Sequence, residues 1–187
     1  MSIALREKDL ENYQALVRKV DELCAAVNRE FADQILCRAG CSGCCRELTL
    51  FPVEAAALLT ALSGLPREPA ARIAAAPADG RTGSCPLLAD GLCLVYASRP
   101  IICRTHGLPL LLKVAGENRV DFCPENFREA KALPGQAIIN LELLNQALVA
   151  INALFIETTA AAFLKSGQRQ SISALIEIWK GLNHDTA

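Results

Sequence analysis

Eight of the nine cysteines in this 187-residue chain form two groups between Cys37 and Cys123. The first group occupies "CRAGCSGCC", in which four cysteines lie within nine residues and the last two are adjacent. The second group is spread over "CPLLADGLC", "IICR" and "DFCP". Closely spaced thiolates repel one another unless a cation lies between them. This pattern therefore predicts metal binding or thiol chemistry.

The spacing within each group limits the kind of site. Gly40 and Gly43 give the first loop the backbone freedom to surround a metal centre. Adjacent side chains tend to diverge, so Cys44 and Cys45 are expected to serve two sites, or one site and its surroundings, rather than one ion. The second group has gaps of seven, nine and nineteen residues, which are too wide for a zinc finger or ribbon. Closure of the site must then depend on the fold.

Two other interpretations of the first group are not favoured. Cys37, Cys41 and Cys44 have the C-x3-C-x2-C spacing of radical enzymes that use S-adenosylmethionine, but those enzymes place it after a strand of a βα barrel. Here a long predicted helix precedes it. Cys41 and Cys44 also form a C-x-x-C, as in thiol oxidoreductases, without the βαβ context of a thioredoxin-like fold.

Several other residues could have a role near the cysteines. Cys24 occupies the apolar stripe of a predicted helix and is expected to be a buried core thiol. His106 lies three residues after Cys103, where it could be a ligand, support one, or be exposed. No acid/base constellation is found around His106 and His184, the two histidines. Four arginines flank the cysteines and could offset thiolate charge through N–H···S bonds or be solvated: Arg38, Arg46, Arg99 and Arg104.

The elements that must position these residues are mainly helical. Apolar side chains at alternating spacings of three and four predict a long helix from about Lys8 to Ile35. The same spacing recurs from about Pro134 to Ala162, and the matching stripes are expected to pack together. A shorter helix is predicted after Ser171, its N-cap, with Gly181 as its end.

Shorter elements are predicted between the long helices. Helices are expected at Pro52–Leu62 and over "REPAARIAAA", followed by a loop at "PADGRTGS". The stretch "LPLLLKVAGENRVDFC" predicts two strands around a turn at Gly116, Glu117 and Asn118. The fold class is therefore mainly α: a helical bundle with long first and penultimate helices, an irregular cysteine-rich middle segment and one short β-hairpin.

Length and composition predict a single domain over residues 1–187, with a metal-binding segment at 37–124. The chain is 52% hydrophobic and 21% charged with a net charge of −1, which is typical of a soluble globular protein and shows no basic excess for nucleic acid. The first residues lack a signal-peptide pattern, so a cytoplasmic location is expected. Polar residues such as Asn140 and Glu142 in the longest apolar region favour a core helix over a membrane span. A protein partner and the oligomeric state stay open.

The ordered cysteine pattern resembles a known family. "CRAGCSGCC" followed by "CPLLADGLCLVYASRPIICR" and a later "CP" is similar to the bacterial CxxCxxCC family, also called YkgJ-like, a zinc- or iron-chelating domain. The resemblance covers roughly residues 37–124, about half of the chain, and includes Tyr96, Arg99 and Pro100. One departure is a third residue in the first gap, where the family name implies two. It lengthens the loop without removing a ligand.

The resemblance implies a metal centre, either zinc or an iron–sulfur cluster, and little about a reaction. Iron–sulfur is preferred because the gaps are irregular, the thiols outnumber what one zinc needs, and Cys85 and Cys123 each precede a proline as the last ligand does in bacterial ferredoxins. The implied ligands are Cys37, Cys41, Cys44, Cys45, Cys85, Cys93, Cys103 and Cys123.

Three functions are consistent with such a centre. The preferred one is a metal-binding protein whose iron–sulfur cluster serves electron transfer, sensing or metal delivery. The alternative is structural zinc that contributes folding free energy to a helical interaction module. An iron–sulfur-dependent enzyme is the least favoured, because no catalytic residues could be assigned.

Overall fold

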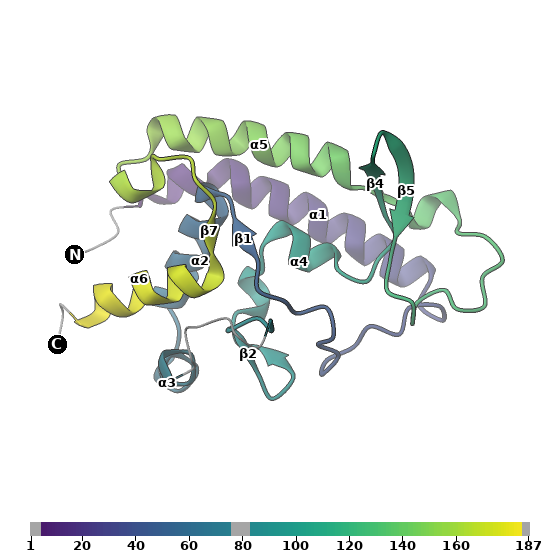
Figure 1. Ribbon diagram of the computed structural model, residues 1–187, viewed down its shortest axis with the longest axis horizontal. Helices are drawn as coiled ribbons and strands as arrows, with labels where there is room; N and C mark the ends of the chain where they lie inside the picture. The colour runs from purple at the N-terminus through teal and green to yellow at the C-terminus, as the bar shows by residue number, and fades with distance from the viewer. Residues whose placement is uncertain (1–4, 76–82, 185–187) are drawn as a thin grey trace.

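A computed structural model of the chain describes residues 5–75 and 83–184 (Figure 1). The fold is mainly α, as predicted, with three small sheets among the described residues. The α-helices are α1 (Glu11–Glu30), α2 (Pro52–Ser63), α3 (Arg67–Ala75), α4 (Ile101–Thr105), α5 (Leu141–Thr158) and α6 (Ile172–His184). The strands are β1 (Thr49–Leu50), β2 (Leu88–Ala89), β3 (Leu92–Cys93), β4 (Leu110–Val114), β5 (Glu117–Asp121), β6 (Ile139–Asn140) and β7 (Gln170–Ser171).

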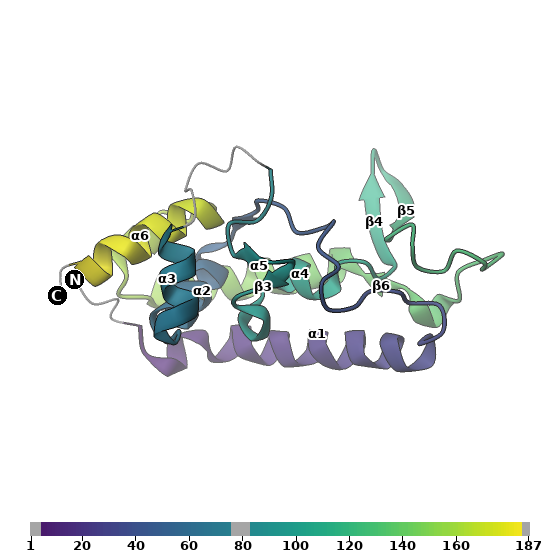
Figure 2. The same ribbon diagram turned by 90° about the horizontal axis from the view of Figure 1, so that it is seen from below.

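The two long helices pack side by side, as their matching stripes predicted. α1 and α5 run in opposite directions and contact each other (Figures 1 and 2). The stripe of α1 buries Tyr13, Val20 and Val27. α5 buries Leu144 and Phe155 from the equivalent stripe. Burial of these apolar faces is what holds the two helices together.

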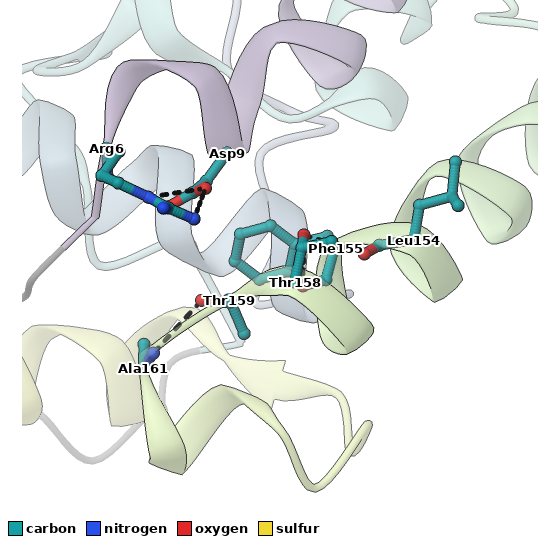
Figure 3. A network of polar contacts seen from close by, with 7 residues as sticks. All are labelled: Arg6, Asp9, Leu154, Phe155, Thr158, Thr159 and Ala161. Atoms are coloured by element: carbon teal, nitrogen blue, oxygen red, sulfur yellow. Dashed lines mark hydrogen bonds and ion pairs between the residues drawn. The ribbon is translucent and has the colours of Figure 1, made fainter.

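Polar contacts lie at the end of the pair where α1 begins and α5 ends (Figure 3). A 3₁₀ turn at Glu7–Leu10 precedes α1, and the Arg6 backbone N–H donates to the Asp9 carboxylate at 3.1 Å. α5 ends at Thr158, short of the predicted Ala162, because the chain turns away after it. The Ala161 N–H donates to the Thr159 hydroxyl oxygen at 3.2 Å, and this bond fixes the turn.

A cap explains one further difference from the predicted helix bounds. α5 begins after Asn140 rather than near Pro134, because the Asn140 side chain accepts from the Leu143 N–H at 3.1 Å and sets the first turn. Ser171 caps α6 as predicted, with its hydroxyl oxygen accepting from the Ala174 N–H at 3.1 Å. Gly181 does not end this helix, which continues to His184.

Helix α5 is a surface helix with one buried stripe rather than a core helix. Its contacts are with α1 and the 3₁₀ turn before it, α2 and β4, and they leave Leu143, Val149 and Leu154 exposed. In the described part of the chain it is the one helix whose length and composition would allow it to cross a membrane. A single helix that passes this test is weak evidence for a membrane span.

Two β-hairpins form where one was predicted. In the predicted hairpin, β4 and β5 pair antiparallel and β6 joins β4 in parallel. Its turn is Ala115–Gly116, both at positive φ, so Glu117 and Asn118 belong to β5 and not to the turn. The second hairpin, β2–β3, turns at Asp90–Gly91, an Asp-Gly pair of the kind that two-residue hairpin loops prefer.

The elements are distributed along the α1 and α5 pair (Figure 2). α2, α3 and α6 gather towards one end, and the β4–β5 hairpin lies near the other. α2 is buried over most of its length and contacts both α5 and α6. The short α4 packs against α1 between these two ends. The predicted loop at "PADGRTGS" lies mostly outside the described residues.

Candidate metal centre

The eight predicted ligands come from four separate segments. Four of them lie in the loop between α1 and β1. Cys85 precedes β2 and Cys93 ends β3, so the β2–β3 hairpin separates these two thiols. Cys103 lies within α4, and Cys123 follows β5 by two residues. All nine cysteines of the chain are described, and all are free thiols.

Most of these cysteines meet at one cavity of about 690 Å³. Cys123 does not line this cavity. Cys24 and His106 do line it, together with Arg99 and Tyr96. The seven predicted ligands in its lining are Cys37, Cys41, Cys44, Cys45, Cys85, Cys93 and Cys103.

Backbone contacts hold the first loop against the β2–β3 hairpin. Gly91 lies so close to the loop that a Cβ on it would be 3.3 Å from the Gly40 carbonyl oxygen. The Cys85 N–H donates to the Cys45 carbonyl oxygen at 3.2 Å. These contacts bring Cys45 and Cys85 together although they are far apart in the sequence. A metal centre made from both groups of cysteines requires this proximity.

Asn126 and Gly107 join the other end of the first loop to the segment after β5. The Asn126 side chain accepts from the Leu36 N–H at 2.8 Å and donates to the Gly107 carbonyl oxygen at 2.6 Å and to Cys37 Sγ at 3.4 Å. The Cys123 N–H also donates to the Gly107 carbonyl, at 3.3 Å. Asn126 was not identified from sequence, because nothing in the chain's periodicity marks a contact across 89 residues.

The short helix α4 is fixed at its start by a buried carboxylate. Glu54, only 3% exposed, accepts from the Phe51 N–H and the Ile101 N–H, each at 3.2 Å. It therefore caps α2 and α4 together. Burial raises the pKa of Glu54. The sequence predicted a favourable dipole interaction within α2 for this residue but not its link to the helix of Cys103.

Burial makes the thiols poor acids in the absence of a cation. Burial, together with the smaller effect of neighbouring thiols, raises the pKa of Cys85 to about 11 and that of Cys103 to about 12. The pKa values of Cys37 and Cys44 are also raised, first by burial. These cysteines are therefore protonated at neutral pH in the free protein, and metal binding would release their protons.

Two of the four flanking arginines, Arg99 and Arg104, interact with carbonyl groups, a carboxylate and an aromatic ring. Within the described ranges, the Arg104 side chain donates to Asp21 and to backbone carbonyls rather than to sulfur. Arg99 stacks over the Tyr96 ring at 3.6 Å and donates to the Cys103 carbonyl at 3.4 Å. Its positive charge counteracts the effect of burial on the pKa of Cys93. Arg99 thus offsets thiolate charge through space.

Cys24 is a buried core thiol, as predicted. It is 7% exposed on the inner face of α1, and its Sγ donates to the Arg104 carbonyl oxygen at 3.5 Å. Burial, and then the charge of Arg99, lowers the pKa of His106, so this imidazole is neutral at the edge of the cavity. Its role as a ligand stays a prediction.

The donor chemistry fits zinc or iron, since soft thiolates select these metals. Among residues 5–75 and 83–184, however, no three Cys, His, Asp or Glu side chains form a group ready to hold one metal ion. Metal–sulfur bonds of about 2.3 Å would therefore require the cysteine segments to move closer together. The exposed Cys37, Cys41 and Cys44 are on the irregular loop best able to do so.

Comparison with known families assigns this segment. Residues 36–124 match the CxxCxxCC family, described as a putative zinc- or iron-chelating domain. This segment, just under half of the chain, is similar to that family and is called the CxxCxxCC domain below. The match contains all eight predicted ligands and excludes α1, α5 and α6. Neither the curated proteins nor the solved structures gave a significant match.

Gly107 gives a direct test of the CxxCxxCC domain's packing. Its φ is +89°, and an added Cβ would lie 2.6 Å from Cys37 Sγ. Gly107→Ala should therefore displace Cys37 and lower metal content, in addition to a backbone strain of about 1–2 kcal/mol measured by urea unfolding. Gly116→Ala is the matched control, because its φ is +87° and nothing lies within 4 Å of an added Cβ. Equal metal content in both variants would contradict the prediction.

Proposed function

We propose that the CxxCxxCC domain of this chain holds iron–sulfur clusters rather than zinc alone. The observation that supports this most is that seven cysteines line one cavity of about 690 Å³ while no three described ligands converge on a single ion. Four thiolates around one zinc form a compact tetrahedron. A cluster contains several metal atoms and bridges thiolates that are farther apart.

Exposure supports a role in which the cluster communicates with a partner. Cys37, Cys41 and Cys44 are exposed, so a cluster bound to them would lie at the protein surface. Electron transfer, sensing and metal delivery all require such access. We further propose that the protein works in the cytoplasm, because nine free thiols are typical of a reducing compartment.

Structural zinc is the second candidate, and one observation favours it. The ligands come from four segments, so a metal that bound them would connect α4, the β2–β3 hairpin, the first loop and the segment after β5. Such cross-linking contributes folding free energy without any redox chemistry.

Anaerobic purification distinguishes the two candidates. We expect a brown protein whose visible absorption is bleached by dithionite, with iron and acid-labile sulfide in equal amounts. Elemental analysis of the same sample measures zinc. A colourless protein with stoichiometric zinc and no sulfide would overturn the iron–sulfur proposal and support the structural one. Cys24→Ser is the matched control, since it removes a thiol from the core and should leave the iron and sulfide content unchanged.

A further inference from the structure

We propose that two copies of this chain associate through the exposed face of α5, as an antiparallel pair of α5 helices related by a two-fold axis. α5 lies along the outer edge of the molecule (Figure 1). None of the described residues that line the cysteine cavity belongs to α5. The surface is therefore separate from the candidate metal centre, and the proposal does not depend on which metal the protein binds.

A narrow apolar stripe runs along the exposed face of α5. It consists of Leu143, Ala147, Ala150 and Leu154. Spacings of four, three and four residues keep these side chains within about 60° of one another around the helix. Leu143 is 60% exposed and Leu154 is 53% exposed, so the chain itself does not cover the two leucines. Apolar residues at this spacing form the seam along which two helices pack in a coiled coil.

The stripe reads the same in both directions, and this favours a second copy of the chain as its partner. The midpoint lies between Leu148 and Val149. In an antiparallel pair centred there, Leu143 of each copy meets Leu154 of the other, and Ala147 of each meets Ala150 of the other. A two-fold interface requires this reciprocity. The small alanines lie at the crossing point, where they allow the helix axes to approach closely.

The charges around the stripe are complementary in an antiparallel pair. From Leu143 to Ile156, α5 has no charged residue, so the contact would bury none. Glu157 lies near the C-terminal end of α5, where its charge opposes the helix dipole. In the pair it approaches the start of the second α5. Lys113 lies beside that start, since its N–H donates to the Glu142 carboxylate at 3.4 Å.

Glu157 and Lys113 are also available to interact across the pair. Both are exposed, and neither has an ion-pair partner among residues 5–75 and 83–184. The stripe itself spans only about 17 Å from Leu143 to Leu154. Such a contact buries less than the roughly 1,200 Å² of the smallest stable interfaces, so the dimer should be weak and reversible.

Sedimentation equilibrium of the full chain over a range of concentrations tests the association. Reductant is present so that exposed cysteines cannot cross-link two chains. Wild type should change from monomer to dimer as the concentration rises. Leu143→Glu should weaken dimerisation by at least about tenfold, because it puts a charge into both leucine layers. A wild-type chain that stays monomeric up to about 1 mM would overturn the proposal.

Val149→Glu is the matched control. Val149 is 51% exposed on the same helix, but it lies at least about 100° around the helix from every residue of the stripe. Its substitution should leave dimerisation unchanged. Circular dichroism and metal content should be equal in both variants and wild type, which excludes unfolding and a metal bridge as causes. Equal weakening by Leu143→Glu and Val149→Glu would contradict the stripe as the interface.

Mixtures of variants test the antiparallel direction. Leu143→Glu and Leu154→Lys should each be monomeric alone, and their equimolar mixture should dimerise because the introduced opposite charges face each other. Leu143→Glu mixed with Leu143→Lys should stay monomeric, since antiparallel pairing separates these two positions by about 17 Å. Dimerisation of the second mixture and not the first would show parallel helices and overturn the proposed pair.

A lipid surface is the competing partner for an exposed apolar helix face. Helices that lie on membranes are rich in Lys and Arg on their polar face, and α5 has neither residue. We therefore expect wild type not to float with phosphatidylcholine vesicles. Flotation of wild type that Leu143→Glu abolishes, together with a monomer in solution, would overturn the dimer and assign the face to a membrane.

Discussion

Replacing Asn126 with alanine should lower the free energy of unfolding by about 3 kcal/mol and lower the metal content of the folded protein. Asn126 is 1% exposed, and its amide satisfies the Leu36 N–H, the Gly107 carbonyl and Cys37 Sγ. Alanine leaves the Leu36 N–H without its acceptor, and the Gly107 carbonyl keeps only the bond from the Cys123 N–H. It also releases Leu36 and Cys37 from the segment after β5, so Cys37 no longer lies next to Cys123.

Two further variants separate stability from metal binding. Asn152→Ala removes another buried asparagine, which accepts from the Val53 N–H at 3.1 Å in the contact of α2 with α5. It should cost a comparable free energy of unfolding but leave the metal content of the folded protein unchanged. Asn126→Asp keeps the acceptor for Leu36 and loses the donor to Cys37, so it should retain more stability than Asn126→Ala while losing metal. Full metal content in folded Asn126→Ala would refute the positioning role.

The scaffold of long helices was predictable because its determinants are local. The stripe of α1 repeats over five turns, and Ser171 caps α6 one residue before its first turn. Helix ends were harder, since the end of α5 depends on the turn at Thr159 and Ala161 rather than on the apolar pattern. The β2–β3 hairpin was missed although Asp90–Gly91 marks it, because strands of two residues have no periodicity to detect.

The candidate site was predictable in composition but not in arrangement. The order of the cysteines was enough to identify the CxxCxxCC pattern, whereas the assignment of Cys44 and Cys45 to different sites stays a prediction. Which cysteine approaches which depends on contacts between distant segments, such as that of Cys45 with Cys85. The same applies to Asn126 and to the link from Glu54 to Ile101, which spans 47 residues.

Glu54→Ala should produce the second large effect, a loss of about 2–4 kcal/mol in the free energy of unfolding, because two buried N–H groups lose their acceptor. The damage extends to α4, whose first N–H is one of the two. α4 contains Cys103, so the folded protein should also lose metal. Urea unfolding and metal analysis of the folded fraction measure the two effects. Glu68→Ala in α3 is the control, since Glu68 is exposed and should contribute less than about 0.5 kcal/mol.

Titration of the Glu54 carboxyl group should make the unfolding free energy of wild type depend on pH differently from that of Glu54→Gln. Because burial raises its pKa above the ordinary 4.5, the folded state binds a proton that the unfolded state has already released. The stabilisation from this group is complete below pH 4.5 and is lost as the pH rises through the folded pKa. Glu54→Gln cannot titrate, so its unfolding free energy should lack this decline. If wild type and Glu54→Gln follow parallel curves over that range, Glu54 is ionised in the folded protein and caps both helices as a carboxylate.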